Sequence, residues 1–413
     1  MIKTYKFRLR PTKKQIEKLD WTLETCRTLY NSCLVDRNRH YKETCKGLSR
    51  IDQQRILVQD KKNITYLTDI HSQVLQDVLF RVEKAYKNFF RRLKDKSGKA
   101  GFPRFKLVGR YDSITYTQSG FEIIDGKLIL SKIGTVKLKQ NRSIKGIVKT
   151  CNIKKENNKW YVCLSVKYTK YTVYNSIVKE KIIINNHIGV DMGIKSLAVL
   201  SNGKVISNPK YLAKSEDKLI KKQKQLSKKK KGSNNRKKEV KKVAKFHKRI
   251  VNQRKDFQHK ESRKIVDNYD AIGAEDLKIK NMVKNHHLAK SIHDSGWGQF
   301  LSYLKYKAEE AGKLFMKVNP RNTSKTCYKC GYIYKEMTLD IREWICPVCH
   351  TMHDRDVNAA NIIDKRMLEK IRLEWPKYTL AETGSMDDIV DSNIYALKSI
   401  PSLKQEASSV RAR

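Results

Sequence analysis

The chain has 413 residues, enough for two to four domains of ordinary size. Its 89 Lys and Arg residues outnumber 42 Asp and Glu residues and give a formal net charge of +47. Repulsion among so many positive charges has no benefit for an enzyme that acts on small molecules. A high positive charge does favour binding of a polyanion, because each neutralised phosphate releases condensed counterions. The composition therefore predicts a nucleic-acid partner, with a merely soluble basic surface as the alternative.

No segment approaches the roughly 20 apolar residues that a membrane span requires, and the basic runs lack the broad apolar face of a membrane-surface helix. Residues 1–10 alternate charged and apolar side chains and contain no signal-peptide core. Of nine cysteines, only four fall in paired CxxC spacing, and the others are most simply reduced thiols. We therefore expect a cytoplasmic protein with no membrane partner.

The N-terminal part predicts one strand followed by helices. Residues 2–10 alternate as a strand does, and Pro11 ends the pattern. Thr12 begins a capping box, and helical spacing follows it. A second long helix is predicted over residues 69–93, because apolar residues recur along one stripe. Residues 12–95 are therefore expected to form a small helical domain inserted after the first strand.

From residue 101 the pattern changes to short alternating segments separated by turns. An Asp-Gly turn joins residues 121–124 to residues 127–130 as a predicted hairpin, and an Asn-Asn turn predicts another farther along. Several strands at this spacing are typical of a small β-barrel. We expect residues 1–11 and 96–180 to form it together.

The C-terminal part mixes strands and helices, which predicts an α/β domain over residues 181–324 and 353–372. Strands are expected at residues 188–191, 196–200, 271–274 and 314–318, and helices at residues 215–266, 297–311 and 357–368. The segment 373–413 loses periodicity and is expected to be a flexible tail. The predicted fold class is thus a multidomain α+β protein.

Two CxxC pairs separated by 15 residues have the spacing of a zinc ribbon, here over residues 325–352. The ligands are Cys327, Cys330, Cys346 and Cys349. A reduced redox CxxC pair is the alternative, but it explains one pair and not two. Four thiolates leave no open position for water, so this Zn²⁺ is expected to be structural, and the nearby His350 and His353 are left unassigned.

Three acidic residues are candidates for a catalytic metal site. Asp191 and Glu275 end strand-like segments, and Asp356 precedes a helix. A few carboxylates holding two Mg²⁺ ions about 3.5–4 Å apart can neutralise both the attacking and the leaving oxygen of a phosphodiester. Each residue alone is more simply a turn or helix cap. The metal site is predicted because all three occur together in a very basic chain.

These residues carry a family resemblance. Residues 189–203 resemble the first motif of RuvC-type nucleases, residues 275–277 the second and residues 354–362 the third. A zinc ribbon between the second and third motifs is the arrangement of the TnpB family, transposon-encoded RNA-guided DNA endonucleases similar to compact type V CRISPR effectors. The runs at 320–327 and 101–105 also resemble the family pattern.

The resemblance implies a wedge barrel with an inserted recognition domain, then a RuvC domain of RNase H-like fold with an inserted zinc ribbon. It assigns Asp191, Glu275 and Asp356 to Mg²⁺. It selects Asp356 over Asp354 because the family motif places the catalytic carboxylate two residues before Asn358. It also implies a guide RNA and a double-stranded DNA target beside a short flanking motif. One RuvC site would cut both strands of the DNA. The protein is expected to act as a ribonucleoprotein, with a monomer favoured, and to be associated with the nucleoid of a prokaryotic cell.

Two further features concern nucleic acid. The run from Lys218 to Lys255 contains one acidic residue and is expected to contact RNA or heteroduplex phosphates, with a solvated helix face as the alternative. Four polar residues could read base edges of the flanking motif, or be ordinary surface residues. They are Gln73, Gln76, Thr117 and Gln118.

Two other functions remain as alternatives to the guided nuclease. One is a nucleic-acid-binding regulator without catalysis, against which the three acidic residues argue. The other is a transposase or an unguided resolvase on the same fold.

Overall fold

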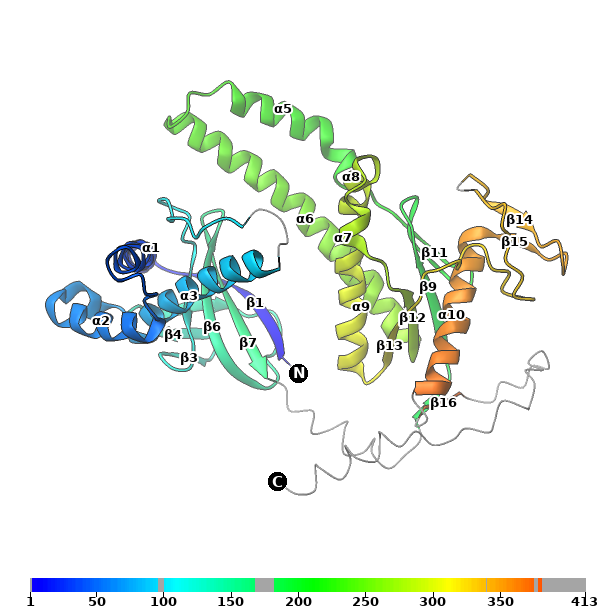
Figure 1. Cartoon of the computed structure of the whole chain (residues 1–413), viewed down its shortest axis with the longest axis horizontal. Helices are drawn as coiled ribbons and strands as arrows, with labels where there is room; N and C mark the ends of the chain where they lie inside the picture. The colour runs from blue at the N-terminus through cyan, green and yellow to red at the C-terminus, as the bar shows by residue number, and fades with distance from the viewer. Residues whose placement is uncertain (1, 96–99, 168–181, 339, 375–377, 381–413) are drawn as a thin grey trace, which may run out of the picture. The chain divides into compact units, whose positions relative to one another are not determined.

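The computed structural model describes residues 2–95, 100–167, 182–338, 340–374 and 378–380 (Figure 1). Its contacts divide the chain into two units, which are described separately. The first comprises residues 1–175 and 218–249, and the second comprises residues 176–217 and 250–413. Most of the predicted flexible tail lies outside the described residues.

One antiparallel sheet of seven strands forms the first unit's framework, in the order β2-β6-β7-β1-β5-β4-β3. The strands are β1 (Ile2–Arg10), β2 (Ser113–Tyr116), β3 (Phe121–Ile124), β4 (Lys127–Leu130), β5 (Gly134–Lys139), β6 (Ile147–Glu156) and β7 (Lys159–Lys167). Hydrogen bonding among them leaves β2 and β3 as edges, so it does not close the barrel that the sequence predicts. Both predicted hairpins are present, and the turn residues Asp125 and Asn157 adopt positive φ.

Three helices follow β1 and share its core: α1 (Lys13–Thr44), α2 (Arg50–Asn63) and α3 (Ser72–Lys94), with a short 3₁₀ turn η1 (Thr65–Asp69). The predicted capping box of α1 is confirmed, because the Thr12 hydroxyl accepts from the Gln15 backbone and the Gln15 side chain accepts from the Thr12 backbone. Helix α2 was not predicted. Ser49 and Asp52 cap it, and its apolar residues are too few to give a clear stripe.

The basic run forms two helices, α5 (Glu216–Ser227) and α6 (Asn234–Asn268), where the sequence predicted one helical region. The turn between them contains Gly232, which adopts φ +86°. In the first unit the Arg236 guanidinium donates to the Leu226 carbonyl, and Lys222 lies over the Phe246 ring. These contacts hold the two helices together as a hairpin (Figure 1).

A five-stranded sheet organises the second unit, in the order β11-β10-β9-β12-β13. The strands are β9 (His187–Met192), β10 (Ser196–Leu200), β11 (Val205–Ser207), β12 (Ala271–Glu275) and β13 (Leu314–Val318). β9, β12 and β13 are parallel, whereas β9, β10 and β11 form an antiparallel meander. Every strand predicted between residues 188 and 318 is thus confirmed.

Helices cover both faces of this sheet. They are α7 (Ile279–Met282), α8 (His286–Ser295), α9 (Trp297–Ala311) and α10 (Arg355–Glu374), with the 3₁₀ turn η2 (Ala213–Ser215). Even-numbered residues of β9 and β12, such as Val190 and Ile272, pack with α9 and the end of α6. Because side chains alternate along a strand, the odd-numbered residues face α10. This alternation decides on which face Asp191 and Glu275 lie.

The remaining strands are short. β14 (Glu343–Ile345) pairs with β15 (Met352–Asp354) directly before α10, and β8 (Ile182–Ile184) pairs with β16 (Tyr378–Leu380). No helix among the described residues is apolar and long enough to cross a membrane.

Candidate active site

The three predicted carboxylates come together at one end of the five-stranded sheet. Asp191 lies near the end of β9, Glu275 is the last residue of β12, and Asp356 lies in the first turn of α10. β9 and β12 are adjacent parallel strands with Val190 opposite Ala274. Asp191 and Glu275 therefore lie side by side, on the face that α10 covers.

Burial makes ionisation of two carboxylates in this cluster unfavourable when no cation is bound. Burial, followed by the negative charges of Glu275 and Asp356, raises the pKa of Asp191 to about 8. Burial also raises the pKa of Glu275, although the hydrogen bond from Thr323 and the charge of Arg366 act in the lowering direction. A carboxylate whose pKa is raised by burial and by neighbouring negative charges becomes stable as an anion when a cation lies beside it.

Asp354 and Asp356 have different roles at the start of α10. The Asp354 carboxylate accepts from the backbone N–H groups of Asp356 and Val357, each at 2.9 Å, so it caps the helix. Asp356 instead lies 3.6 Å from the Arg342 guanidinium and 3.7 Å from that of Arg355. The cap occupies Asp354, which favours Asp356 as the third metal ligand.

The carboxylates fit Mg²⁺ in charge and donor type but do not form a closed cage. Among the described residues, the cysteines are the group of three or more potential ligands whose donor atoms all lie within 4.8 Å of one another. Mg²⁺ usually keeps several waters and takes one or two protein carboxylates together with phosphate oxygens. An open cluster of acids therefore suits a site that a phosphodiester completes.

Side chains from two other segments hold the loop after Asp191 in place. The Trp297 indole N–H donates to the Gly193 carbonyl at 3.0 Å. The Asn208 amide donates to the Ile194 carbonyl and to the Ser295 hydroxyl, each at 2.9 Å. These bonds hold the chain where it leaves β9, and so they limit the movement of the carboxylate.

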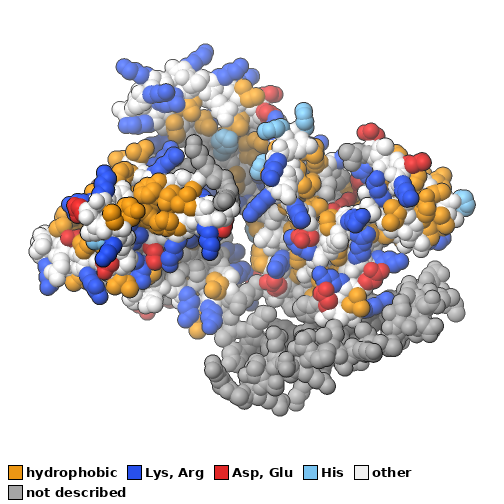
Figure 2. All heavy atoms as spheres, viewed as in Figure 1, with side chains coloured by type: hydrophobic (Ala, Val, Ile, Leu, Met, Phe, Trp, Pro, Cys, Tyr) orange, Lys and Arg blue, Asp and Glu red, His pale blue; other side chains and the backbone are white. Residues whose placement is uncertain are grey.

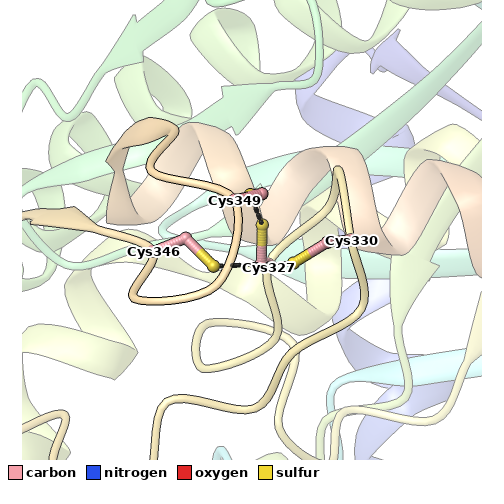
Figure 3. Close-up of side chains that lie close together, drawn as sticks. All are labelled: Cys327, Cys330, Cys346 and Cys349. Atoms are coloured by element: carbon pink, nitrogen blue, oxygen red, sulfur yellow. Dashed lines mark hydrogen bonds between the residues drawn. The ribbon is translucent and has the colours of Figure 1, made fainter.

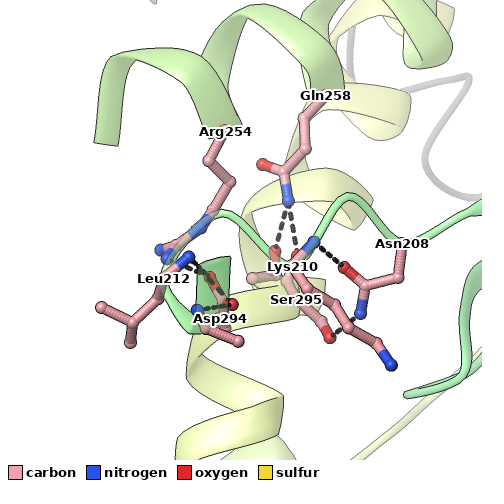
Figure 4. Close-up of polar contacts among 9 residues, drawn as sticks. Asn208, Lys210, Leu212, Arg254, Gln258, Asp294 and Ser295 are labelled. Carbon is pink, nitrogen blue, oxygen red and sulfur yellow. Dashed lines mark hydrogen bonds and ion pairs between the residues drawn. The ribbon is translucent and has the colours of Figure 1, made fainter. Parts of the chain in front are cut away.

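Behind this loop, Asp294 joins three segments (Figure 4). Its carboxylate, which is 8% exposed as a residue, accepts from the Leu212 backbone at 3.1 Å and from the Arg254 guanidinium at 2.8 Å. The Gln258 amide on α6 donates to the Ser295 carbonyl at 2.8 Å. The second-unit part of α6 is thereby tied to the loop that supports Asp191.

The four predicted zinc ligands converge (Figure 3). The Sγ atoms of Cys327 and Cys349 lie 3.6 Å apart, and those of Cys330 and Cys346 lie 3.5 Å apart. Four thiolates about 2.3 Å from one Zn²⁺ in a tetrahedron would be separated by similar distances. The donor set therefore fits structural Zn²⁺.

His353 lies beside this cluster rather than in it. Its Nε2 atom is 3.1 Å from the Cys327 sulfur, and the residue is 3% exposed. Trp344 and Tyr328 pack against the imidazole, with ring centroids 4.7 and 5.3 Å away. Spacing rules do not predict this contact, because His353 lies outside the CxxC pattern.

Three family models match the chain. The one described as "Probable transposase" matches residues 146–286, "Cas12f1-like, TNB domain" matches residues 297–363, and "Helix-turn-helix domain" matches residues 1–46. A "Putative RNA-guided DNA endonuclease" of Streptomyces pristinaespiralis is 32% identical over 369 residues, covering 87% of this chain and 88% of the relative. The chain belongs to the OrfB/TnpB family.

A second TnpB-family relative, "Putative RNA-guided DNA endonuclease InsQ" of Escherichia coli (strain K12), is also 32% identical, covering 88% of this chain and 91% of the relative. Among solved structures, "Structure of the mini-RNA-guided endonuclease CRISPR-Cas_phi3" aligns with 89% of this chain and 92% of that chain, at 11% identity and a TM-score of 0.45.

The predicted base-reading residues of this TnpB-family chain separate into two pairs. The Gln73 amide oxygen accepts from the Thr117 hydroxyl and from the backbone N–H groups of Gln118 and Ser119. Gln73 is thus occupied in holding the loop after β2. The side chains of Gln76 and Gln118 are exposed, and only this pair stays available for the predicted role.

The α5–α6 hairpin of the TnpB-family chain carries a dense positive surface. Figure 2 shows Lys and Arg side chains along its visible face. Glu239 is the acidic residue within the run from Lys218 to Lys255, and Lys242 pairs with it at 2.7 Å. A surface of one sign at this density favours phosphate contacts.

Proposed function

We propose that the chain is an RNA-guided, Mg²⁺-dependent endonuclease that cleaves double-stranded DNA beside a short flanking motif, through one RuvC-type site. The observation that carries the proposal is the convergence of Asp191, Glu275 and Asp356 from three separate segments. The two relatives are both named RNA-guided DNA endonucleases, which supports this class of activity. Metal dependence and RuvC type rest on the acidic cluster and on the motif resemblance.

The side chains of the acidic cluster would act by binding the metal ions and holding them in position. Asp191 and Glu275 present carboxylates from the rigid sheet, and Asp356 presents one from the first turn of α10. Two Mg²⁺ ions held there would supply charge neutralisation for the attacking and leaving oxygens of the scissile phosphate. Arg342 and Arg355, both close to Asp356, would keep its carboxylate directed toward the cluster.

We assign separate roles to the predicted domains. In this proposal residues 1–11 and 96–180 form the wedge domain, residues 12–95 the recognition domain, and residues 181–324 and 353–372 an RNase H-like RuvC domain into which the zinc ribbon 325–352 is inserted. Base pairing with the guide RNA would select the sequence, while basic residues grip phosphates and A-form shape. We propose a monomeric ribonucleoprotein in a prokaryotic cytoplasm.

The test begins with the full-length protein purified with its co-expressed RNA. A matching double-stranded target with Mg²⁺ should be cleaved, and Asp191→Asn should abolish cleavage while the RNA stays bound. Asp276→Asn is the matched control, because Asp276 adjoins Glu275 but is exposed and paired with Lys317 at 2.8 Å. Cleavage independent of the RNA sequence would contradict guidance, and full activity of Asp191→Asn would contradict the acidic site.

A further inference from the structure

The segment before the first zinc ligand contacts one member of the acidic cluster. The Thr323 hydroxyl donates to Glu275 Oε1, and it also lies 3.2 Å from the Pro320 carbonyl. Thr323 is 4% exposed and Glu275 is 7% exposed. A buried carboxylate that accepts from a buried hydroxyl depends on that bond for its orientation, because water does not replace it.

The same segment contacts the helix that carries the third carboxylate. The Asn358 side chain, which is 1% exposed, accepts from the Tyr328 backbone N–H at 3.0 Å and donates to the Thr326 carbonyl at 2.7 Å. Asn358 lies on α10 two residues after Asp356. Both ends of its amide are therefore used to fasten the chain beside Cys327 to the first turn of α10.

A tight turn joins these two contacts. The Asn322 carbonyl accepts from the Lys325 and Thr326 backbone N–H groups at 3.1 and 3.0 Å, and from the Thr326 hydroxyl at 2.8 Å. Cys327 follows at once, with its backbone N–H bonded to the Tyr332 carbonyl and its sulfur in the four-cysteine cluster. The turn leaves little freedom between Thr323 and Cys327, so the position of one determines that of the other.

We propose that Thr323 and Asn358 are positioning residues through which the zinc-binding segment sets the separation of Glu275 and Asp356. This inference rests on the proposed metal site at the acidic cluster. It makes the structural Zn²⁺ a determinant of Mg²⁺ affinity as well as of local folding. Groups that orient metal ligands typically change metal affinity or activity by about 10–100-fold when they are removed.

Thr323→Val is the sharpest variant, because it removes the hydroxyl and keeps the shape of the side chain. The concentration of Mg²⁺ that half-saturates cleavage should rise by about 10-fold or more, with the rate at saturating Mg²⁺ much less affected. Thr323→Ser, which keeps the hydroxyl, should restore the wild-type value. Asn358→Ala should act in the same direction, and Thr338→Val is the matched control because Thr338 is exposed on the zinc-binding segment.

A second measurement does not depend on activity. Mn²⁺ binding to the RNA-loaded protein, followed by electron paramagnetic resonance, should weaken in Thr323→Val although the zinc content stays at one ion per chain. Removing Zn²⁺ from the wild-type protein should also weaken Mn²⁺ binding, and should weaken it less in Thr323→Val because that connection is already lost.

Two variants distinguish failure of the positioning role from failure of the metal site. Unchanged Mn²⁺ affinity and unchanged half-saturating Mg²⁺ in Thr323→Val, with binding still lost in Asp191→Asn, would overturn the inference and leave the proposed function standing. Unchanged Mn²⁺ binding in Asp191→Asn would overturn the proposed metal site, and the inference with it.

Discussion

The close approach of α10 to the sheet makes Gly189 the most informative position to change. A Cβ atom on Gly189 would lie 2.0 Å from the Ala360 carbonyl oxygen and 2.7 Å from the Asp364 backbone nitrogen. Both neighbours are helix backbone, which cannot rotate away as a flexible side chain can. Gly189→Ala should therefore move α10 away from β9, and Asp356 with it, since Ala360 is one helical turn from Asp356.

The size of the movement follows from the contact distance. Ordinary van der Waals contact begins at 3.4 Å, so the helix and strand must separate by about 1.4 Å along that line. Overpacking of this kind costs about 1–3 kcal/mol of folding stability. A displacement of about 1 Å at a catalytic group can lower the rate by about 100-fold. We therefore expect the Gly189→Ala protein to fold and to bind its RNA. Its rate of target cleavage should be about 100-fold lower than that of the wild type.

Single-turnover cleavage of a matched target by RNA-loaded protein measures this effect, and thermal unfolding measures the stability cost. Gly298→Ala is the matched control: Gly298 lies in α9 of the same unit, and a Cβ there would meet only the Ile279 Cδ1 atom at 3.4 Å. This control should cleave at the wild-type rate. A Gly189→Ala rate within threefold of wild type, with unchanged unfolding temperature, would refute the geometric reasoning.

Three further predictions concern protonation, zinc and charge pairing. Because burial and neighbouring charges raise the pKa of Asp191 to about 8, metal binding must displace a proton at lower pH, so the half-saturating Mg²⁺ concentration should fall as pH rises from 6 to 8. A pH-independent Mg²⁺ titration would be inconsistent with that raised pKa. Cys346→Ala should lose Zn²⁺ and expose the zinc-binding segment to proteolysis, and retained zinc content would sink the four-cysteine assignment. Burial raises the pKa of Glu156, but hydrogen bonds and charges from Lys6 and Lys248 outweigh it and lower that pKa to about 2. This stabilisation is present above the unfolded pKa of 4.5 and is lost as pH falls through about 2. Glu156→Gln should therefore lower the free energy of unfolding at pH 7 by about 1 kcal/mol, which is less than the full pKa shift implies because solvent screens these partly exposed charges. The difference in unfolding free energy between the two proteins should narrow below pH 4.5, and a difference independent of pH would argue against the ion pairs.

Local patterns allowed much of the second unit to be predicted. Strand β9 ends a hydrophobic run at Asp191, and β12 is a short apolar run that ends at Glu275, so both carboxylates were visible as charges at strand ends. The zinc ligands followed from spacing alone. Both features depend on residues close together in the sequence, which is the range in which periodicity and spacing are informative.

Contacts between distant segments could not be predicted in this way. The Thr323 hydroxyl reaches Glu275 across 48 positions, and no spacing rule connects them. The requirement for glycine at Gly189 and Gly273 appears only when α10 lies against the sheet, where a Cβ on Gly273 would be 3.0 Å from the Met367 Cβ. The strands of the first unit were likewise predicted to form a small β-barrel, whereas hydrogen bonding among the described strands leaves β2 and β3 as edges, because strand count and spacing do not determine closure.

Target cleavage by the RNA-loaded protein, compared between the wild type and Asp191→Asn, tests the proposed guided nuclease at its catalytic site. We expect the wild-type protein to cut a matching double-stranded target in Mg²⁺ and to leave a mismatched target uncut, and we expect Asp191→Asn to bind the same RNA and target without cutting. Cleavage by Asp191→Asn at the wild-type rate, or equal cleavage of matched and mismatched targets by the wild type, would contradict the proposed function.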